Sequence, residues 1–430
     1  RAHEDERRGA QRHGGDASEG ALVAAELLER APAPAGELAL DGTVRPVRGV
    51  LALAELASRS RAAGVIVAAA CVAEARLVCD LPVVGVADIR GMASFLAGDD
   101  PVSPELGAGT APSSAEFDRH VPAALDLSHI RGQPMAKRAV EIAAVGGHNL
   151  LLVGPPGCGK TMIARSLVDL LPPLGREEIL EVQGVRSAAG LAFDASNLSR
   201  PGFRTPHHTC SPASLVGGGT SPRPGEVSLA HHGILMLDEL PEFSAAAIDA
   251  LREPLEDRMV TVARAAGTVR FPASVLVVAT MNGSRNLRGD SDPEAGVDRR
   301  VLERIGGAVI DRFDLHVAMR ATPITAFLDP PDGPTTGATR DRVIAARDFG
   351  TVRSSVLNAR LSGEALDQAC PLDRPILRRL AGMIEELGLS GRAFDRIRRV
   401  ARSIADLDGS ASVLSEHLDE AMAFRVLDRI

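Results

Sequence analysis

The chain contains no tryptophan, no tyrosine and only 11 phenylalanines among its 430 residues. Proteins that hold single-stranded nucleic acid without sequence preference stack the bases on aromatic side chains. The composition therefore argues against such a stacking platform. The formal net charge is −8, so the chain as a whole does not attract nucleic acid, and any DNA contact must come from a local basic patch.

Cysteine is scarce as well, and its placement limits the compartment. The five cysteines form no CxxC pair, and Cys158 lies inside a glycine-rich loop, which argues against a disulfide framework or a zinc site. The longest apolar stretch near the N-terminus, residues 64–73, is much shorter than a membrane span. No basic-then-apolar leader opens the sequence. We therefore expect a cytoplasmic protein without a membrane partner.

Lysine is nearly absent. Only Lys137 and Lys160 occur, so 46 of the 48 basic residues are arginine. The base composition of the gene explains such a bias. Arginine replaces lysine wherever a generic positive charge suffices, so a lysine that persists is a candidate for a specific role. Lys160 lies in the glycine-rich loop.

The length predicts two or three domains. Residues 1–20 have mixed charge and no periodicity, so we expect a disordered or fragmentary start. Residues 21–98 alternate short strands and helices. Within them the pattern predicts a hairpin around Asp41-Gly42, a helix at ALAELASRSRAAG and a buried strand at VIVAA. Residues 99–126 are rich in Gly, Pro and Ser and predict a linker.

The second half of the chain predicts an α/β fold. Residues 127–328 alternate apolar strands with helices, which is typical of a mostly parallel sheet. Residues 329–339 predict a second linker. Residues 340–430 carry amphipathic helical patterns without a convincing strand, so we expect a small all-helical domain there.

A phosphate-binding loop is the most specific motif. The apolar run 149–153 leads into GPPGCGKT, a full GxxxxGK[ST] pattern, and a helical segment at 162–171 follows. Backbone N–H groups of such a loop cradle phosphate oxygens, the lysine reaches the β and γ phosphates, and the Thr hydroxyl ligates Mg²⁺. The expected cofactors are ATP and Mg²⁺. The loop residues are Gly154, Pro155, Pro156, Gly157, Cys158, Gly159, Lys160 and Thr161.

Polar residues follow two further apolar strands. Asp238 and Glu239 directly follow the apolar run 233–237. This is the form expected of a central strand that delivers carboxylates at its carboxyl end. We expect Asp238 to hold Mg²⁺ through water and Glu239 to polarise the attacking water. The next strand, predicted at 274–280, is followed by Met281 and Asn282, whose amide can orient that water.

These residues together resemble the magnesium-chelatase branch of the AAA+ ATPases, and within it the subgroup typified by ComM and YifB. The resemblance covers about residues 36–430. It implies a P-loop αβα core, a C-terminal helical lid and a hexameric ring with ATP at the subunit interfaces. The most specific stretches are GHNLLLVGPPGCGKT, RTPHHTCSPASLVGGG, PGEVSLAHHGILMLDELPEF, ALREPLED and SGRAFDRIRRVARSIADL.

The resemblance also implies roles for arginines. Asn282 corresponds to sensor 1, Arg312 to the arginine finger that reaches a neighbouring subunit's site, and Arg392 to the sensor 2 of the lid. Each arginine can instead be a surface ion-pair partner, and Arg304 is a rival for the finger. Arg396 and Arg399 fall on the same helix face as Arg392, where solvent exposure is the simpler interpretation.

A β-hairpin is predicted at residues 260–271, around Ala266-Gly267. In the family, a hairpin before sensor 1 points toward the pore of the ring, so Arg264 and Arg270 are candidate DNA contacts. An ordinary solvated hairpin is the alternative. After Asn282, many relatives carry Pro and a cysteine cluster, whereas this chain continues with GSRN, so no role of those cysteines transfers.

The N-terminal block resembles the Lon-protease-like domain that opens ComM-type chains, through the stretch GELALDGTVRPVRGV. A Lon-type Ser–Lys dyad needs a lysine to activate its serine. No lysine precedes Lys137, so we expect this domain to be non-proteolytic. The front part of the family domain has no counterpart in residues 1–35, so the domain is expected to be partial or divergent.

Three functions are compatible with the sequence. The leading one, by resemblance, is a hexameric ATP-driven motor for DNA branch migration or remodelling during DNA uptake and recombination. The second is a chelatase-type motor subunit that assists Mg²⁺ insertion into a porphyrin, against which the protease-like block counts. The third is an ATP-binding scaffold without motor activity, which the intact GKT, Asp-Glu, Asn and Arg set disfavours.

Overall fold

The computed structural model describes residues 33–78, 81–97, 126–219, 222–264, 267–283, 299–328, 330–331, 333–389, 391–425 and 427. The predictions for residues 1–20, for nearly all of linker 99–126 and for the loop after Asn282 lie outside them. The chain divides into two compact units, each described here by itself. One unit comprises residues 1–120 with Gly175–Ser199, and the other comprises Val121–Leu174 with Arg200–Ile430.

The first unit contains a small parallel sheet and the predicted hairpin. The sheet has the order β1 (Ala33–Ala35), β4 (Val65–Ala68), β5 (Val83–Val86). All four residues of β4 are buried, as the VIVAA pattern predicts. Strands β2 (Glu37–Leu38) and β3 (Val44–Arg45) pair antiparallel, which confirms the hairpin around Asp41-Gly42. The helices are α2 (Val50–Arg59), α3 (Val72–Ala75), α4 (Ile89–Ala97) and α8 (Arg176–Ala189).

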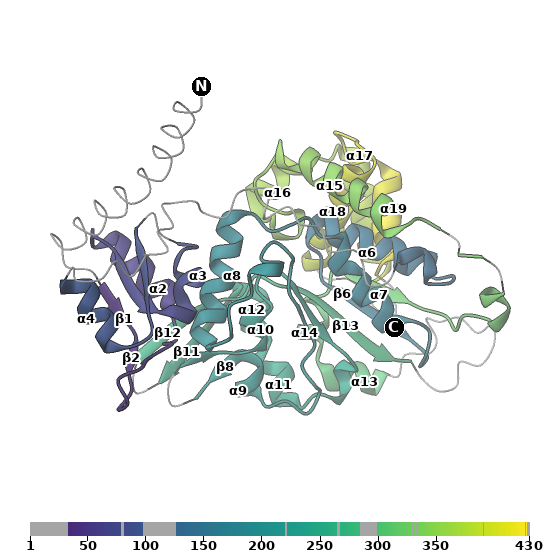
Figure 1. The fold of residues 1–430 in the computed structure, drawn as a ribbon. Helices are drawn as coiled ribbons and strands as arrows, with labels where there is room; N and C mark the ends of the chain where they lie inside the picture. Colours follow the sequence, from purple (N-terminus) through teal and green to yellow (C-terminus); the bar gives the residue numbers. More distant parts are fainter. Residues whose placement is uncertain are drawn as a thin grey trace, which may run out of the picture. The chain divides into compact units, whose positions relative to one another are not determined.

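The second unit is built on a five-stranded sheet in which every pairing is parallel (Figure 1). Two of its strands, Leu150–Gly154 and Ile234–Leu237, are apolar and buried along their whole length, as expected of strands that are covered on both faces. Because the pairings are parallel, the carboxyl ends of all five strands lie at one edge of the sheet. This confirms the predicted α/β class. The order is β14 (Leu315–Ala318), β6 (Leu150–Gly154), β13 (Leu276–Asn282), β10 (Ile234–Leu237), β7 (Phe203–Arg204).

The elements described in the C-terminal part of the second unit, from residue 336 on, are helices, as predicted, and they share a core with the sheet (Figure 1). Helix α6 (Pro134–Gly146) packs against both α15 and α18. One hydrophobic cluster includes Val140 of α6, Leu152 of β6 and Ile397 of α18. The lid helices are α15 (Thr336–Thr351), α16 (Gly363–Ala369), α17 (Arg374–Glu386), α18 (Gly391–Leu407) and α19 (Ser415–Ala423).

Two boundaries differ from those expected from sequence. Helix α15 begins at Thr336, inside the predicted linker 329–339, because the Thr335 hydroxyl accepts a hydrogen bond from the N–H of Ala338 and caps the helix. Gly175–Ser199, expected within the core at 127–328, belongs to the first unit, where α8 contacts α2. No described helix has the length and apolar character needed to cross a bilayer.

Candidate nucleotide site

The P-loop joins β6 to α7 (Lys160–Ser166) and needs glycine at three positions. Gly157 and Gly159 have φ of 77° and 96°, in the left-handed region that favours glycine. A Cβ at Gly154 would lie 2.6 Å from the carbonyl oxygen of Met319. The glycines therefore allow a tight loop close to the neighbouring chain segment. Such a loop presents backbone N–H groups to anionic oxygens.

The Lys160 side chain lies back over this loop. Its ammonium donates to the carbonyl oxygens of Gly154 and Pro155, at 2.7 and 3.0 Å, and to Oδ1 of Asn282 at 3.0 Å. Burial lowers the pKa of Lys160, while the charges of Asp238 and Glu239 act in the opposite direction. The three acceptors hold the only positive charge of the loop at the carboxyl edge of the sheet.

The two acids after β10 are held by a threonine on the neighbouring strand. Asp238 and Glu239 are exposed, and Thr280 of β13 donates to Oδ1 of Asp238 at 2.6 Å. The same Thr280 hydroxyl accepts the N–H of Glu239 at 2.9 Å. Glu239 has φ of 52°, a left-handed conformation that costs a residue other than glycine about 1–3 kcal/mol. The role of Thr280 was not predicted from the sequence. The feature that could have indicated it is a hydroxyl side chain two residues before Asn282.

Asn282 links the lysine and the glutamate. Its Nδ2 donates to Oε1 of Glu239 at 2.9 Å, while its Oδ1 accepts from Lys160. The structure therefore brings together Lys160, Asp238, Glu239 and Asn282 at one edge of the sheet. Thr161, half-buried on α7, follows Lys160 directly. Hydroxyl and carboxylate oxygens are the ligands that Mg²⁺ prefers, so this set fits a Mg²⁺-nucleotide.

An adjoining cavity of about 610 Å³ was not foreseen from sequence. Gln133 forms part of its wall and fixes it to the P-loop, because Nε2 donates to the carbonyls of Arg320 at 2.6 Å and Cys158 at 3.3 Å. Gln133 has φ of 59° and begins α6. The available signal was the Gly132-Gln133-Pro134 turn before a helix. The remaining lining is largely apolar and includes Met135, Val317, Ala318, Pro323 and Phe424.

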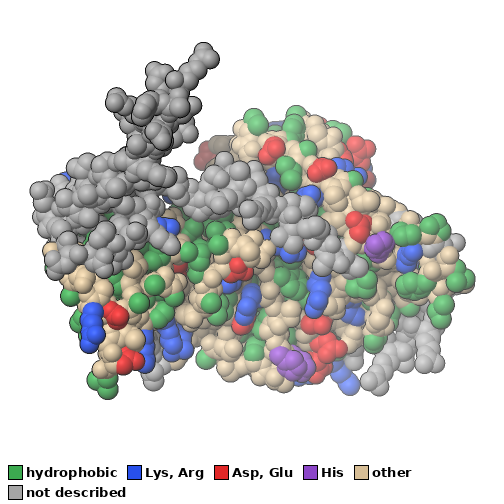
Figure 2. Space-filling view, viewed as in Figure 1, with side chains coloured by type: hydrophobic (Ala, Val, Ile, Leu, Met, Phe, Trp, Pro, Cys, Tyr) green, Lys and Arg blue, Asp and Glu red, His purple; other side chains and the backbone are tan. Residues whose placement is uncertain are grey.

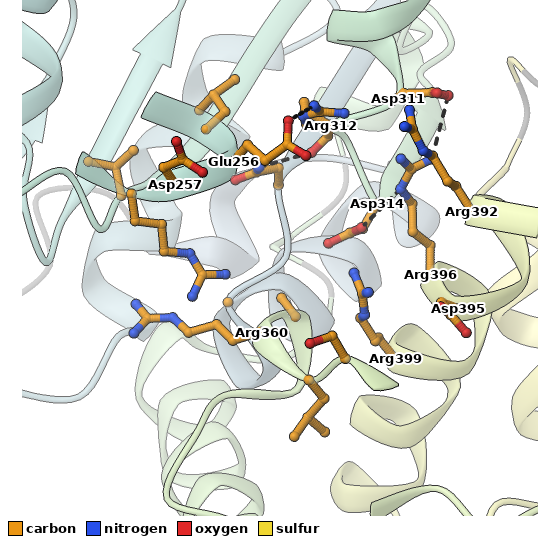
Figure 3. Close-up of a pocket in the computed structure, with 18 of the residues that line it drawn as sticks. Glu256, Asp257, Asp311, Arg312, Asp314, Arg360, Arg392, Asp395, Arg396 and Arg399 are labelled. Atoms are coloured by element: carbon orange, nitrogen blue, oxygen red, sulfur yellow. Dashed lines mark hydrogen bonds and ion pairs between the residues drawn. The ribbon is translucent and has the colours of Figure 1, made fainter. Parts of the chain in front are cut away.

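Arg312 and Arg392 lie elsewhere, in a second cavity of about 580 Å³ (Figure 3). Asn149, Val275 and Asp314 line this cavity, and each immediately precedes a strand of the sheet, β6, β13 or β14 respectively. The P-loop and Asn282 lie at the other ends of those strands. Five strand residues span about 16 Å, so the two arginines lie far from the P-loop of their own chain.

The structure corrects the expectation that Arg396, on the same helix as Arg392, is exposed to solvent. Arg396 is 7% exposed rather than solvated, because Asp311 and Asp314 approach its guanidinium at 3.5 and 4.0 Å. Arg312 pairs with Glu256. Arg392 is exposed at the start of α18. Arg304 is exposed on α13 (Arg299–Ile305) and is not among the residues that line the cavity.

The predicted hairpin is present. Strands β11 (Met259–Arg264) and β12 (Gly267–Pro272) pair antiparallel. Val260, Val262 and Phe271 are buried, whereas Arg270 is exposed. The side chain of Arg264 lies outside the described residues. The hairpin therefore has an apolar side packed on the protein and a polar side that faces solvent.

Two family models match most of this chain. The model of the magnesium chelatase subunit ChlI family matches residues 126–327, and the model of the ChlI C-terminal domain matches residues 333–425. The chain is similar to an uncharacterized protein YifB of Salmonella typhimurium, 38% identical over 401 residues, which are 92% of this chain and 77% of the relative.

The chain belongs to the magnesium-chelatase ChlI family. The competence protein ComM of Haemophilus influenzae is also 38% identical, over 402 residues that cover 92% of this chain and 77% of that protein. A shorter similarity joins the chain to an archaeal Lon protease of Thermoplasma volcanium, 43% identical over 63 residues, or 15% of this chain and 10% of the protease. The chain is thus a magnesium-chelatase-like AAA+ ATPase, as the sequence motifs predict.

Proposed function

We propose that this chain is a Mg²⁺-ATP-driven motor that assembles into a hexameric ring and remodels branched DNA. The observation that carries the ATPase part is the line of hydrogen bonds from Lys160 through Asn282 to Glu239. A phosphate-binding cation, a water-activating carboxylate and an orienting amide are the parts that phosphoryl transfer needs. All three lie at the carboxyl edge of the sheet, where open α/β sheets bind ligands.

Each residue has a role in this proposal. Lys160 and the loop N–H groups hold the β and γ phosphates, and Thr161 with Asp238 holds the metal. When bound there, the metal would supply positive charge that offsets the negative charge of the phosphates. Glu239 accepts a proton from the attacking water. Asn282 holds the side chains of Glu239 and Lys160 in position relative to each other. Gln133 and the apolar cavity beside the loop accommodate the adenine base, which aromatic and apolar walls suit.

The position of Arg312 and Arg392 supports assembly. An arginine that stabilises the transferred phosphoryl group can be supplied by another protein molecule. Both arginines line the cavity at the amino ends of the strands, whereas the P-loop lies at their carboxyl ends. This position supports a role for both arginines at the nucleotide of an adjoining copy. A closed ring of six copies would complete every site in this way.

The DNA part rests on the relative named competence protein ComM and on the hairpin of β11 and β12, whose exposed Arg270 can meet a phosphate backbone. Figure 2 shows acidic and basic side chains interspersed over the described part of the face in view. This distribution agrees with contact through a local element such as the hairpin. Arg264, the other candidate contact, lies on the same hairpin.

The test is steady-state ATPase activity with Mg²⁺, measured alone and with single-stranded, duplex and four-way-junction DNA. Glu239→Gln is the blank. Stimulation that is strongest with the junction, and lost in Arg270→Gln, is the expected result. Hydrolysis that ignores every DNA would overturn the DNA part and leave the ATPase part standing.

A second candidate is a chelatase-type motor subunit, which the ChlI family match favours. The test is whether the chain, mixed with partner subunits, inserts Mg²⁺ into a porphyrin when ATP is present. Such insertion would replace the proposal that the chain remodels DNA. A chain that stays monomeric with ATP in gel filtration, and binds nucleotide without turnover, would instead indicate an ATP-binding scaffold.

A further inference from the structure

His148 joins the lid to the edge of the sheet. It lies between α6 and β6 in the chain, and its ring is fully buried. Nδ1 lies 3.0 Å from Oδ2 of Asp314, which directly precedes β14. Nε2 lies 2.8 Å from the hydroxyl oxygen of Ser403 on α18. One imidazole therefore bridges a lid helix and the segment that leads into an edge strand.

The hydrogen bonds through His148 have a defined direction. Burial opposes ionisation of Asp314, but the hydrogen bond and charge of His148, with the charges of two arginines of α18, hold the pKa of Asp314 below its usual value. An ionised carboxylate only accepts, so Nδ1 donates to it. In the neutral ring, Nε2 then accepts from the Ser403 hydroxyl, whose other acceptor, the carbonyl of Arg399, is farther away at 3.2 Å. The same hydroxyl accepts from Nδ2 of Asn358 at 3.0 Å.

Glycine at position 146 makes the bond between His148 and Ser403 possible. Gly146 is the last residue of α6, and a glycine within a helix costs roughly 0.5–1 kcal/mol relative to alanine. A Cβ at this position would lie 2.2 Å from both Nε2 of His148 and Oγ of Ser403. Any larger residue would therefore push the ring and the hydroxyl apart.

The next residue, Asn149, holds the segment that carries Arg312. Nδ2 of Asn149 donates to the carbonyl oxygen of Arg312 at 2.9 Å. The backbone carbonyl of Asn149 accepts the N–H groups of Asp314 and Leu315, at 3.0 and 3.1 Å. Asn149 thus fixes the backbone of residues 312–315, while its neighbour His148 fixes the side chain of Asp314.

We propose that His148 is a positioning residue that makes the placement of Arg312 depend on how α18 is seated. Separating buried polar partners costs the desolvation of each group, so a shift of Ser403 with α18 carries His148 and Asp314 with it. Arg396 of the same helix approaches Oδ1 of Asp314 at 4.0 Å, so both carboxylate oxygens are tied to the lid. The inference rests on the proposed role of Arg312 at the nucleotide of an adjoining copy, and it gives the lid a part in setting that arginine.

Hydrogen exchange of the full-length protein tests the link without any turnover. Ser403→Ala removes the hydroxyl, and Gly146→Ala separates it from the ring while every polar group is kept. Each change should speed exchange of the amides of residues 312–315 about tenfold. The two together should add little, because both break the same bond. Gly382→Ala on α17, where an added Cβ meets no atom within 4 Å, is the matched control and should leave this exchange unchanged.

A general loss of stability is separated from positioning by Ile248→Val. Ile248 is buried on α11 (Ala245–Ala250), and this change costs about 0.5–1.5 kcal/mol. Exchange at residues 312–315 that rises in Ser403→Ala or Gly146→Ala beyond what the measured loss of stability explains, and does not in Ile248→Val, supports the proposal. Exchange that follows stability alone in all of these variants would overturn it.

A second experiment asks whether the link reaches the nucleotide. Lys160→Ala chains, which supply Arg312, are mixed with Arg312→Ala chains, which supply the P-loop. Ser403→Ala on the chain that supplies Arg312 should lower the recovered ATP hydrolysis about tenfold to a hundredfold, since a small misplacement of a catalytic group has this effect. On the chain that supplies the P-loop it should lower hydrolysis far less.

The outcomes of the mixing experiment separate this inference from the proposed function. Equal loss from either chain, or loss only from the chain that supplies the P-loop, would show that the lid acts at its own nucleotide and would overturn the inference. Absence of recovery before Ser403 is changed would contradict the proposed role of Arg312 instead. In that case the exchange of residues 312–315 still decides whether His148 positions this segment.

Discussion

The ammonium of Lys160 lies 3.0 Å from the side-chain carbonyl oxygen of Asn282, 122 residues further along the chain. The amide nitrogen of the same Asn282 donates to Glu239. Asn282 therefore uses both ends of its side chain, and a change in the position of Lys160 alters the hydrogen bonding of Glu239.

Glu239→Gln should stop turnover and leave nucleotide binding intact. Glutamine keeps the size of the side chain and can still accept from Asn282, but it cannot accept a proton from water. We expect kcat to fall at least about a hundredfold, in the range of a lost general base, with the nucleotide Kd unchanged. Hydrolysis of ATP by this variant at the parent rate would show that the assignment of Glu239 is wrong.

Asn282→Ala should lower kcat more than it changes nucleotide affinity. The change removes a partner of Lys160 and a partner of Glu239 together, while the P-loop carbonyls still hold the lysine. We expect kcat to fall roughly tenfold to a hundredfold, which corresponds to one or two charge-assisted hydrogen bonds. The matched control is Asn197→Ala, at an exposed position of the first unit. A large rise in KM with unchanged kcat would contradict the role given to Asn282.

The parts of the site that the sequence predicted are those carried by local patterns. The glycines, Lys160 and the acids after β10 follow apolar strand runs, and parallel strands must place their carboxyl ends at one edge. The burial of Arg396 could not be predicted in this way. Its partners Asp311 and Asp314 are about 80 residues away in sequence, and only the packing of the lid on the sheet brings them together. Gln133 was missed for the same reason, since its acceptor Arg320 is remote.

Arg312→Ala should abolish ATP hydrolysis without preventing ATP binding to its own P-loop, because the arginine lies at the opposite edge of the sheet. Mixing it with Lys160→Ala subunits should restore part of the activity. In such a mixture, an intact Arg312 from one variant faces an intact P-loop from the other. Arg304→Ala serves as the control and should stay near the parent rate. Failure of the mixture to recover would indicate that Arg304 is the finger or that Arg312 acts within its own chain.

Ser403→Ala should destabilise the junction of lid and sheet. His148, buried just before β6, bonds Asp314 through Nδ1 at 3.0 Å and the Ser403 hydroxyl of α18 through Nε2 at 2.8 Å. Asn358 also donates to that hydroxyl. Alanine leaves the buried side chains of His148 and Asn358 without this partner, at a cost of about 1–3 kcal/mol of stability. The midpoint of urea unfolding measures this loss of stability.

Ser355→Ala, at an exposed position of the same unit, is the control for Ser403→Ala. It should stay within about 0.5 kcal/mol of the parent. Equal midpoints for the two variants would show that the link through His148 does not stabilise the lid.

Acid should destabilise the second unit through His316, which is buried on β14. Burial lowers the pKa of His316 well below its usual value, and the charges of Arg425 and Arg396 lower it further. The folded state therefore keeps His316 neutral, while the unfolded chain takes up a proton as the pH falls below about 6.5. The stabilisation is present above that pH and is lost below it, at up to about 1.4 kcal/mol per pH unit. The urea midpoint of His316→Asn should fall less between pH 7.5 and pH 5.5 than that of the parent. These two pH values lie on either side of about 6.5, where the unfolded histidine takes up its proton. His207→Asn, at an exposed position, should retain the parent slope, and a parent slope in His316→Asn would assign the acid sensitivity to other groups.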